Sequence, residues 1–194
     1  MRVISGSARG TVLHSIEDVK TRPTLDRVKE SLFNIIQNDI RDAVILDLFS
    51  GSGAIAIEFL SRGAKEAYIC DNSSKATEMI NKNLEKTKLS QKAIVYKKDY
   101  IDCLNEVKNV KFDIIFLDPP YKENLAIKAV EKINNMQLLK NEGIIIIETD
   151  EPERDIKQIN DININYKMYD LRKYGRASLI FLKWREKKWK YSHC

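Results

Sequence analysis

Short apolar runs alternate with longer amphipathic segments between residues 43 and 147. This alternation is typical of β-α-β units that build a parallel sheet. The apolar runs predict strands at 43–48, 67–71, 93–98, 112–117 and 143–148. The amphipathic segments predict helices at 52–61, 74–88 and 124–135. We therefore expect an α/β fold of the Rossmann-like, doubly wound kind.

The two flanks have different patterns. After Pro152, a short predicted helix at 153–160 is followed by β-rich runs at 162–169 and 177–184, joined by a turn with Gly175. These runs predict a hairpin that closes the sheet edge. Residues 1–13 predict a small hairpin or arm, and apolar residues at spacings of three and four predict a helix at 24–37. We expect one domain over 1–194, with a small amino-terminal extension at 1–40 and a Rossmann-like core at 41–194.

Composition narrows the class of protein. A chain of 194 residues that is 43% hydrophobic can bury a core of its own. Its net charge of +5 suits a polyanionic partner without proving one. The three cysteines form no C-x-x-C pattern, which predicts neither a disulfide framework nor a metal site. The amino terminus lacks a signal-peptide core and apolar runs are strand-sized, so we expect a cytoplasmic chain without membrane contact.

A glycine-rich turn follows the first predicted strand, in the run Asp47-Leu48-Phe49-Ser50-Gly51-Ser52-Gly53. Glycines let a ligand approach the backbone, and the next helix begins with unpaired N–H groups. Because Gly51-x-Gly53 also approximates a dinucleotide fingerprint, a nicotinamide enzyme is an alternative. Asp47 favours S-adenosylmethionine instead, since a carboxylate there repels a pyrophosphate and attracts ammonium and sulfonium charges.

Two further acids follow predicted strands. Asp71 ends the second strand, where it can hold ribose hydroxyls, and Asp99 follows the third, where it can accept from the adenine amine. Each acid alone could equally cap a helix, but all three stand at the carboxyl ends of strands, where ligands bind in open α/β sheets. The candidate cofactor-binding residues are Asp47, Phe49, Ser50, Gly51, Gly53, Asp71, Asn72, Asp99 and Tyr100.

The fourth predicted strand ends in Asp118-Pro119-Pro120-Tyr121, our candidate catalytic tetrad. Two prolines stiffen this loop. In a doubly wound sheet the first and fourth strands are neighbours, so Asp118 should face the same crevice as Asp47. There Asp118 and the Pro119 carbonyl can accept hydrogen bonds from an exocyclic amine, with an ordinary low pKa for Asp118, while Tyr121 stacks on the base. The alternative is a rigid turn with a capping aspartate.

With these motifs the chain resembles the bacterial family that methylates guanine N2 in small-subunit ribosomal RNA. The resemblance implies a seven-stranded class I methyltransferase sheet, S-adenosylmethionine as cofactor, and 16S rRNA of an assembling small subunit as partner. Asp71 departs from the family pattern, because Asn72 and Ser73 follow it instead of a charged pair. Besides Asp118 to Tyr121, the resemblance covers Thr21-Arg22-Pro23-Thr24, Asp26-Arg27-Val28, Glu30, Leu32-Phe33-Asn34, Leu46 to Gly53 and Tyr174-Gly175-Arg176.

Basic residues near these segments are candidate phosphate contacts around the pocket, although any single one could be an ordinary solvated residue. They are Arg9, Arg22, Arg27, Lys29, Lys173 and Arg176, of which the four arginines are the RNA-binding candidates. Two other functions remain open: an amino-methyltransferase acting on adenine N6 or another guanine N2, and a catalytically silent RNA-binding assembly factor. We expect a monomer.

Overall fold

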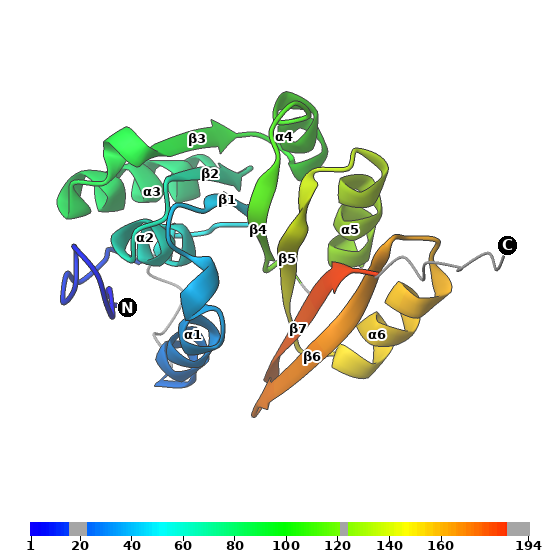
Figure 1. Cartoon of the computed structure of the whole chain (residues 1–194). Helices are drawn as coiled ribbons and strands as arrows, with labels where there is room; N and C mark the ends of the chain where they lie inside the picture. Colours follow the sequence, from blue (N-terminus) through cyan, green and yellow to red (C-terminus); the bar gives the residue numbers. More distant parts are fainter. Residues whose placement is uncertain (16–22, 121–123, 186–194) are drawn as a thin grey trace, which may run out of the picture.

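The computed structural model describes residues 1–15, 23–120 and 124–185, and its helices and strands alternate as the sequence predicts (Figure 1). The helices are α1 (Pro23–Ile35), α2 (Ala54–Ser61), α3 (Ser74–Thr87), α4 (Tyr100–Glu106), α5 (Leu125–Asn135) and α6 (Pro152–Asp161), with short 3-10 turns η1 (Gln37–Asp39) and η2 (Ser90–Lys92). The strands are β1 (Val44–Asp47), β2 (Glu66–Asp71), β3 (Ala93–Lys97), β4 (Phe112–Leu117), β5 (Leu139–Thr149), β6 (Tyr166–Tyr174) and β7 (Ala177–Trp184).

All seven strands form one sheet in the order β3-β2-β1-β4-β5-β7-β6. The first five are parallel, and β7 runs antiparallel to both β5 and β6. The strand order changes direction at β1: β2 and β3 extend the sheet on one side of β1, and β4 and β5 extend it on the other. β1 and β4 are hydrogen-bonded neighbours. The expected seven-stranded α/β fold and the expected contact between the first and fourth strands are both confirmed.

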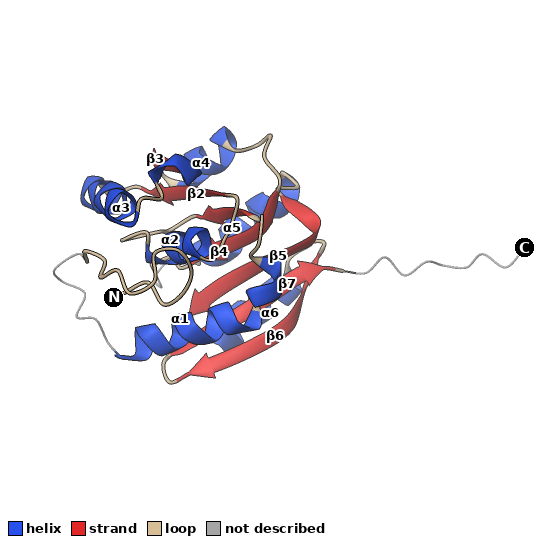
Figure 2. Ribbon diagram, turned by 60° about the vertical axis from the view of Figure 1, so that its left-hand side comes forward, coloured by secondary structure: helices blue, strands red, loops and turns tan. Residues whose placement is uncertain are grey.

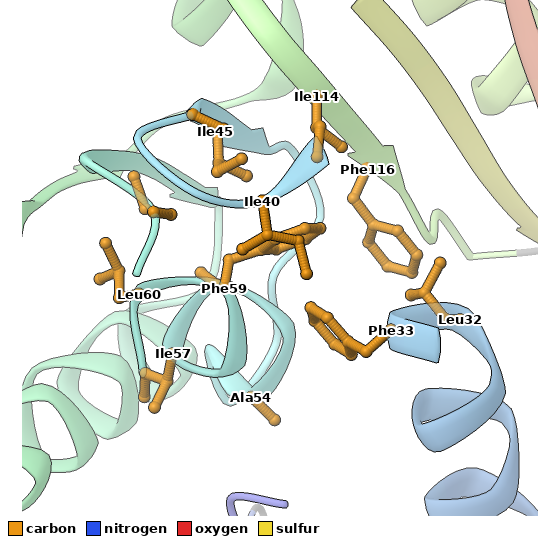
Figure 3. Packing of buried hydrophobic residues seen from close by; sticks show 14 of the residues in the cluster. Leu32, Phe33, Ile40, Ile45, Ala54, Ile57, Phe59, Leu60, Ile114 and Phe116 are labelled. Atoms are coloured by element: carbon orange, nitrogen blue, oxygen red, sulfur yellow. The ribbon is translucent and has the colours of Figure 1, made fainter. Parts of the chain in front are cut away.

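Helices cover both faces of the sheet. One apolar core joins α1, α2 and α3 to one face, and a second joins α4, α5 and α6 to the other. In Figure 2, α1 lies across β5, β7 and β6. In Figure 3, Phe33 of α1 points toward Phe59 of α2, with ring centroids 4.7 Å apart, and Phe116 of β4 lies next to them. None of the described helices is long and apolar enough to cross a bilayer.

Several predicted boundaries were wrong for local reasons. The helix expected at 52–61 begins at Ala54, because Gly53 has a φ of 77°, outside the helical region. The strand expected at 162–169 begins at Tyr166, since Asn165 in the preceding loop donates its N–H to Asn134 of α5. β5 begins at Leu139, before the expected Gly143. The seven-residue α4 was not predicted.

The amino-terminal arm is docked on α2 through buried polar contacts. Glu58 is fully buried and accepts the N–H groups of Ile4 at 2.8 Å and Ser5 at 3.0 Å. Its carboxylate also contacts Lys29 of α1, 2% exposed, at 3.0 Å and Arg62 at 2.7 Å. A buried carboxylate needs such partners to offset its desolvation. Glu58 therefore joins the arm, α1 and α2.

A second contact fixes the turn of the arm. Gly6 has a φ of 83°, and a Cβ there would come within 1.8 Å of the Ser61 carbonyl oxygen. Ser7 donates its N–H to that carbonyl at 2.8 Å, and Ala8 donates to the Ser61 hydroxyl at 3.0 Å. Glycine is thus required at position 6, because the arm passes so close to the last residue of α2.

Candidate active site

The glycine-rich loop leaves β1 and enters α2 with two residues in the left-handed region, Gly51 at φ 56° and Gly53 at φ 77°. A Cβ on Gly53 would lie 3.2 Å from the Ile80 side chain, so this position packs against α3. A Cβ on Gly51 would meet no atom within 4 Å. The loop therefore keeps open space on the Gly51 side, where a ligand can approach the backbone.

Asp71 holds this loop from the end of β2. One of its carboxylate oxygens accepts the N–H of Gly51 at 2.9 Å, and the other accepts that of Ser73 at 2.9 Å. Each oxygen has a further lone pair with which to meet a ribose hydroxyl. Asp71 thus positions the loop in addition to the binding role that we predicted.

Asp99 follows β3 and caps α4, because its Oδ1 accepts the N–H of Ile101 at 2.9 Å. Tyr100 is half-buried and lies against Phe49, with ring centroids 5.6 Å apart. These two rings form an apolar wall beside the loop, while Asn72 is exposed after β2. The structure thus brings the residues after β1, β2 and β3 to one edge of the sheet.

Asn83 of α3 is a loop-positioning residue that the sequence analysis missed. Its buried amide donates to the carbonyl oxygens of Ser52 at 2.9 Å and His14 at 3.0 Å, and accepts the His14 N–H at 2.7 Å. One side chain therefore ties the glycine-rich loop to α3 and to the end of the arm. A lone asparagine in an amphipathic helix gives no local signal of this role.

Asp47 is 1% exposed at the end of β1. The Ser50 hydroxyl donates to its Oδ2 at 2.6 Å, but its Oδ1 accepts no hydrogen bond from any residue that the structure describes. Burial raises the pKa of Asp47 to about 7. A buried carboxylate with a free oxygen is a site where a cation gains a strong interaction.

Asp118 lies close to Asp47 at the same sheet edge. Phe116 of β4 is in register with Asp47, and Asp118 follows that strand two residues later. Pro119 is buried and Pro120 exposed, whereas Tyr121 lies outside the described residues. Among described residues, none donates a hydrogen bond to the Asp118 carboxylate. The tetrad's carboxylate is therefore free to meet a substrate.

The expected ordinary pKa of Asp118 was wrong. Burial, then the nearby carboxyl of Glu148 and then that of Asp47, raise the pKa of Asp118 well above its usual range. Glu148, the next-to-last residue of β5, is 8% exposed and has a pKa raised to about 7 by burial. Sequence reasoning missed Glu148, because a glutamate at the end of an apolar run is no signal until strand register is known.

Two of the four candidate RNA-binding arginines lie at this edge of the sheet. Arg176 is exposed in the turn between β6 and β7, and this turn contacts α1 through a hydrogen bond between the Tyr174 and Ser31 hydroxyls. Arg27 is exposed one helical turn before Ser31. Arg22 lies outside the described residues. The contact between α1 and the turn therefore brings Arg27 and Arg176 to the same side of the molecule.

Of the three remaining basic candidates, Arg9 and Lys29 do not lie at the expected rim. Arg9 is exposed on the arm next to Ser61, which is the end of α2 remote from the glycine-rich loop, because the arm is docked there. Lys29 is buried against Glu58 and donates to the Arg2 carbonyl at 2.7 Å, so the expectation of a phosphate contact for Lys29 was wrong. Lys173 pairs with Glu153 at 2.5 Å.

Comparison with known proteins fits this geometry. Residues 1–183 match the family described as Conserved hypothetical protein 95. The chain belongs to this family. The ribosomal RNA small subunit methyltransferase D of Haemophilus influenzae is 37% identical over 152 residues, covering 77% of this chain and 79% of the relative. The enzyme of the same name from Escherichia coli K12 is 33% identical over 150 residues, covering 77% and 75%.

Solved structures agree with these relatives. The Escherichia coli protein yhhF, described as a candidate methyltransferase, superposes with a TM-score of 0.79 at 26% identity, covering 95% of this chain and 98% of that one. A candidate methylase from Haemophilus influenzae gives a TM-score of 0.75 at 31% identity with the same coverage. The chain is therefore a methyltransferase with the class I fold, and the nicotinamide alternative is set aside.

Proposed function

We propose that this methyltransferase transfers a methyl group from S-adenosylmethionine to the exocyclic N2 of a guanine in 16S rRNA of an assembling small subunit. One observation carries the proposal: the carboxylate of Asp118, free of hydrogen bonds from described residues, lies beside the glycine-rich loop and Asp47. A group that orients an amine and a site that attracts a positively charged donor are thus adjacent. The names of the Haemophilus and Escherichia relatives support ribosomal RNA as the substrate.

The described residues fit S-adenosylmethionine. The free Oδ1 of Asp47 suits its positive charge, and the open space at Gly51 admits ligand atoms against the backbone. In this proposal Asp71 holds the ribose and Asp99 accepts from the adenine amine, with Phe49 and Tyr100 as the apolar wall. When bound, this cofactor supplies an electrophilic methyl group on a sulfonium.

Asp118 acts on the amine in two ways. A base amine is a poor nucleophile because its lone pair is delocalised into the ring, so Asp118 and the Pro119 carbonyl accept its N–H bonds and favour the tetrahedral nitrogen. Methylation would leave the nitrogen cationic, and Asp118 would then accept its proton. A cationic cofactor held at Asp47 would lower the pKa of these carboxyls by Coulomb attraction and so favour the ionised Asp118 that this role needs.

The rest of the site serves the RNA. Tyr121 provides a face on which the target base stacks, worth about 1 to 3 kcal/mol. Arg22, Arg27 and Arg176 bind phosphates around the pocket. Residues 1–40 form the RNA-binding extension and residues 41–194 the catalytic core of a single domain, which acts as a monomer in the cytoplasm.

The test is methyl transfer from tritium-labelled S-adenosylmethionine to small subunits and to 16S rRNA purified from a strain that lacks this gene. We expect label in the RNA, and nucleoside analysis should identify it as N2-methylguanosine. Label in N6-methyladenosine would favour the alternative amino-methyltransferase. RNA binding without any transfer would favour a silent assembly factor, and either result would refute the proposal.

A further inference from the structure

Glu148 is the next-to-last residue of β5, beside the proposed catalytic carboxylate. Leu117 of β4 is in register with Ile147 of β5, so the next residues, Asp118 just after β4 and Glu148 within β5, lie side by side. Adjacent strands are about 4.8 Å apart. The electrostatic effect of Glu148 on Asp118 agrees with this proximity.

The two side chains also share a face of the sheet. Phe116 of β4 and Ile146 of β5 belong to the core under α1, α2 and α3. Side chains two residues apart along a strand point the same way, which places Asp118 and Glu148 on that face together. The next residue, Thr149, points to the other face, where its hydroxyl donates to Asp155 of α6 at 2.6 Å.

The Glu148 carboxyl has no structural partner in the described part of the chain. It is 92% buried, yet no described residue donates a hydrogen bond to it, and its cross-strand neighbour on β7 is Leu179. Burial raises its pKa to about 7, a cost to the folded state. A buried carboxyl that stabilises nothing in the protein itself requires another explanation, such as a ligand with N–H groups.

Guanine has the matching chemistry. Its Watson–Crick edge presents two adjacent donors, the N1–H and the N2 amine, and RNA-binding proteins read unpaired bases on this edge. Two adjacent carboxylates can each accept from one of these donors. Adenine presents a lone pair at N1, which a carboxylate repels.

We propose that Glu148 selects guanine over adenine by accepting the N1–H of the target base while Asp118 accepts from its N2 amine. This inference rests on the proposed function and names a specificity-determining residue for it. Selection works by repulsion as well as attraction. A base with a lone pair at N1 leaves the Glu148 carboxylate without a hydrogen bond and opposite another acceptor, which it repels.

The experiment compares guanine with 2-aminopurine, which keeps the N2 amine but has a lone pair in place of the N1–H. Each base is placed by splinted ligation at the mapped target position of 16S rRNA, which is then assembled into small subunits. Single-turnover rates are measured at pH 8, where Glu148 is mainly ionised, for the parent enzyme, Glu148→Gln and Glu142→Gln. Glu142 is the matched control, because it is an exposed glutamate of the same strand.

The parent and Glu142→Gln should favour guanine over 2-aminopurine by about tenfold to a hundredfold. Glu148→Gln should bring that ratio close to one, since an amide can either accept from an N1–H or donate to an N1 lone pair. A merely structural role would lower both rates together and leave the ratio unchanged.

Two failures are distinguishable. A parent enzyme that methylates guanine N2 but shows no preference over 2-aminopurine, or a Glu148→Gln enzyme with the parental ratio, overturns the role of Glu148 and leaves the proposed function standing. A parent enzyme that transfers no methyl to guanine overturns the proposed function itself.

Discussion

Replacing Asp118 should separate catalysis from folding. The target amine loses one hydrogen bond to a charged acceptor, worth about 1.5 to 3 kcal/mol. If that bond is made mainly in the transition state, Asp118→Ala loses about tenfold to a hundredfold in single-turnover rate, because each 1.36 kcal/mol is about tenfold. Asp118→Asn should lose less, since its amide oxygen still accepts one N–H bond.

Asp118→Asn should also stabilise the folded protein at high pH. Burial and two neighbouring carboxyls raise the folded-state pKa of Asp118, so the native state retains a proton that the unfolded chain releases above about pH 4. The free energy of unfolding therefore falls as pH rises from the unfolded pKa to the raised one. The asparagine side chain carries no proton to lose, so the free energy of unfolding of Asp118→Asn should not fall in this way. The variant should be more stable than the parent at pH 8 and equally stable at pH 4.

Three measurements check the reasoning: rapid-quench single turnover on saturating RNA, calorimetric titration of S-adenosylmethionine, and urea unfolding at the two pH values. We expect a slower rate, little change in cofactor affinity and higher stability at pH 8. A parental rate for Asp118→Ala would show that Asp118 is only a turn residue. A slower rate with lower stability would indicate instead that the substitution disturbs the loop.

Three more predictions concern the loop, the arm and the RNA contacts. Asp71→Ala should weaken S-adenosylmethionine binding by about tenfold or more, because it removes a ligand contact and releases the glycine-rich loop; calorimetry of the folded variant checks this. Gly6→Ala should destabilise the protein by more than about 1 kcal/mol in urea unfolding, because its Cβ would overlap the Ser61 carbonyl. Arg176→Ala should lower the log-log salt slope of RNA binding by about one, whereas Arg41→Ala, an exposed arginine before β1, should not.

Periodicity predicted the fold well where one pattern dominates a segment. The five parallel strands and the amphipathic helices were found because each has a strong repeat of apolar residues. The boundary of β6 was wrong because Ile162 and Ile164 also suit a strand, and only the tertiary contact of Asn165 with Asn134 shows that this segment is a connection. The seven residues of α4 are too few for a clear helical period.

The site was predictable where its residues stand at strand ends in distinctive motifs, as Asp47 at the end of β1 and Asp118 just after β4 do. Glu148 and Asn83 were missed because their roles depend on neighbours distant in sequence. The burial of Lys29 did have a signal in the sequence. Lys29 stands four residues before Phe33, on the apolar stripe of its helix, and that stripe faces the core.

The docking of the arm on α2 has a consequence for the order in which the chain folds. The arm is synthesised before its partners Glu58 and Ser61, which come more than forty residues later in the chain. At a synthesis rate of about 5 to 20 residues per second, the partners of the arm are made several seconds after the arm itself. Lys29 likewise stays in water until Glu58 emerges. The arm is thus among the parts that cannot finish folding until α2 is complete.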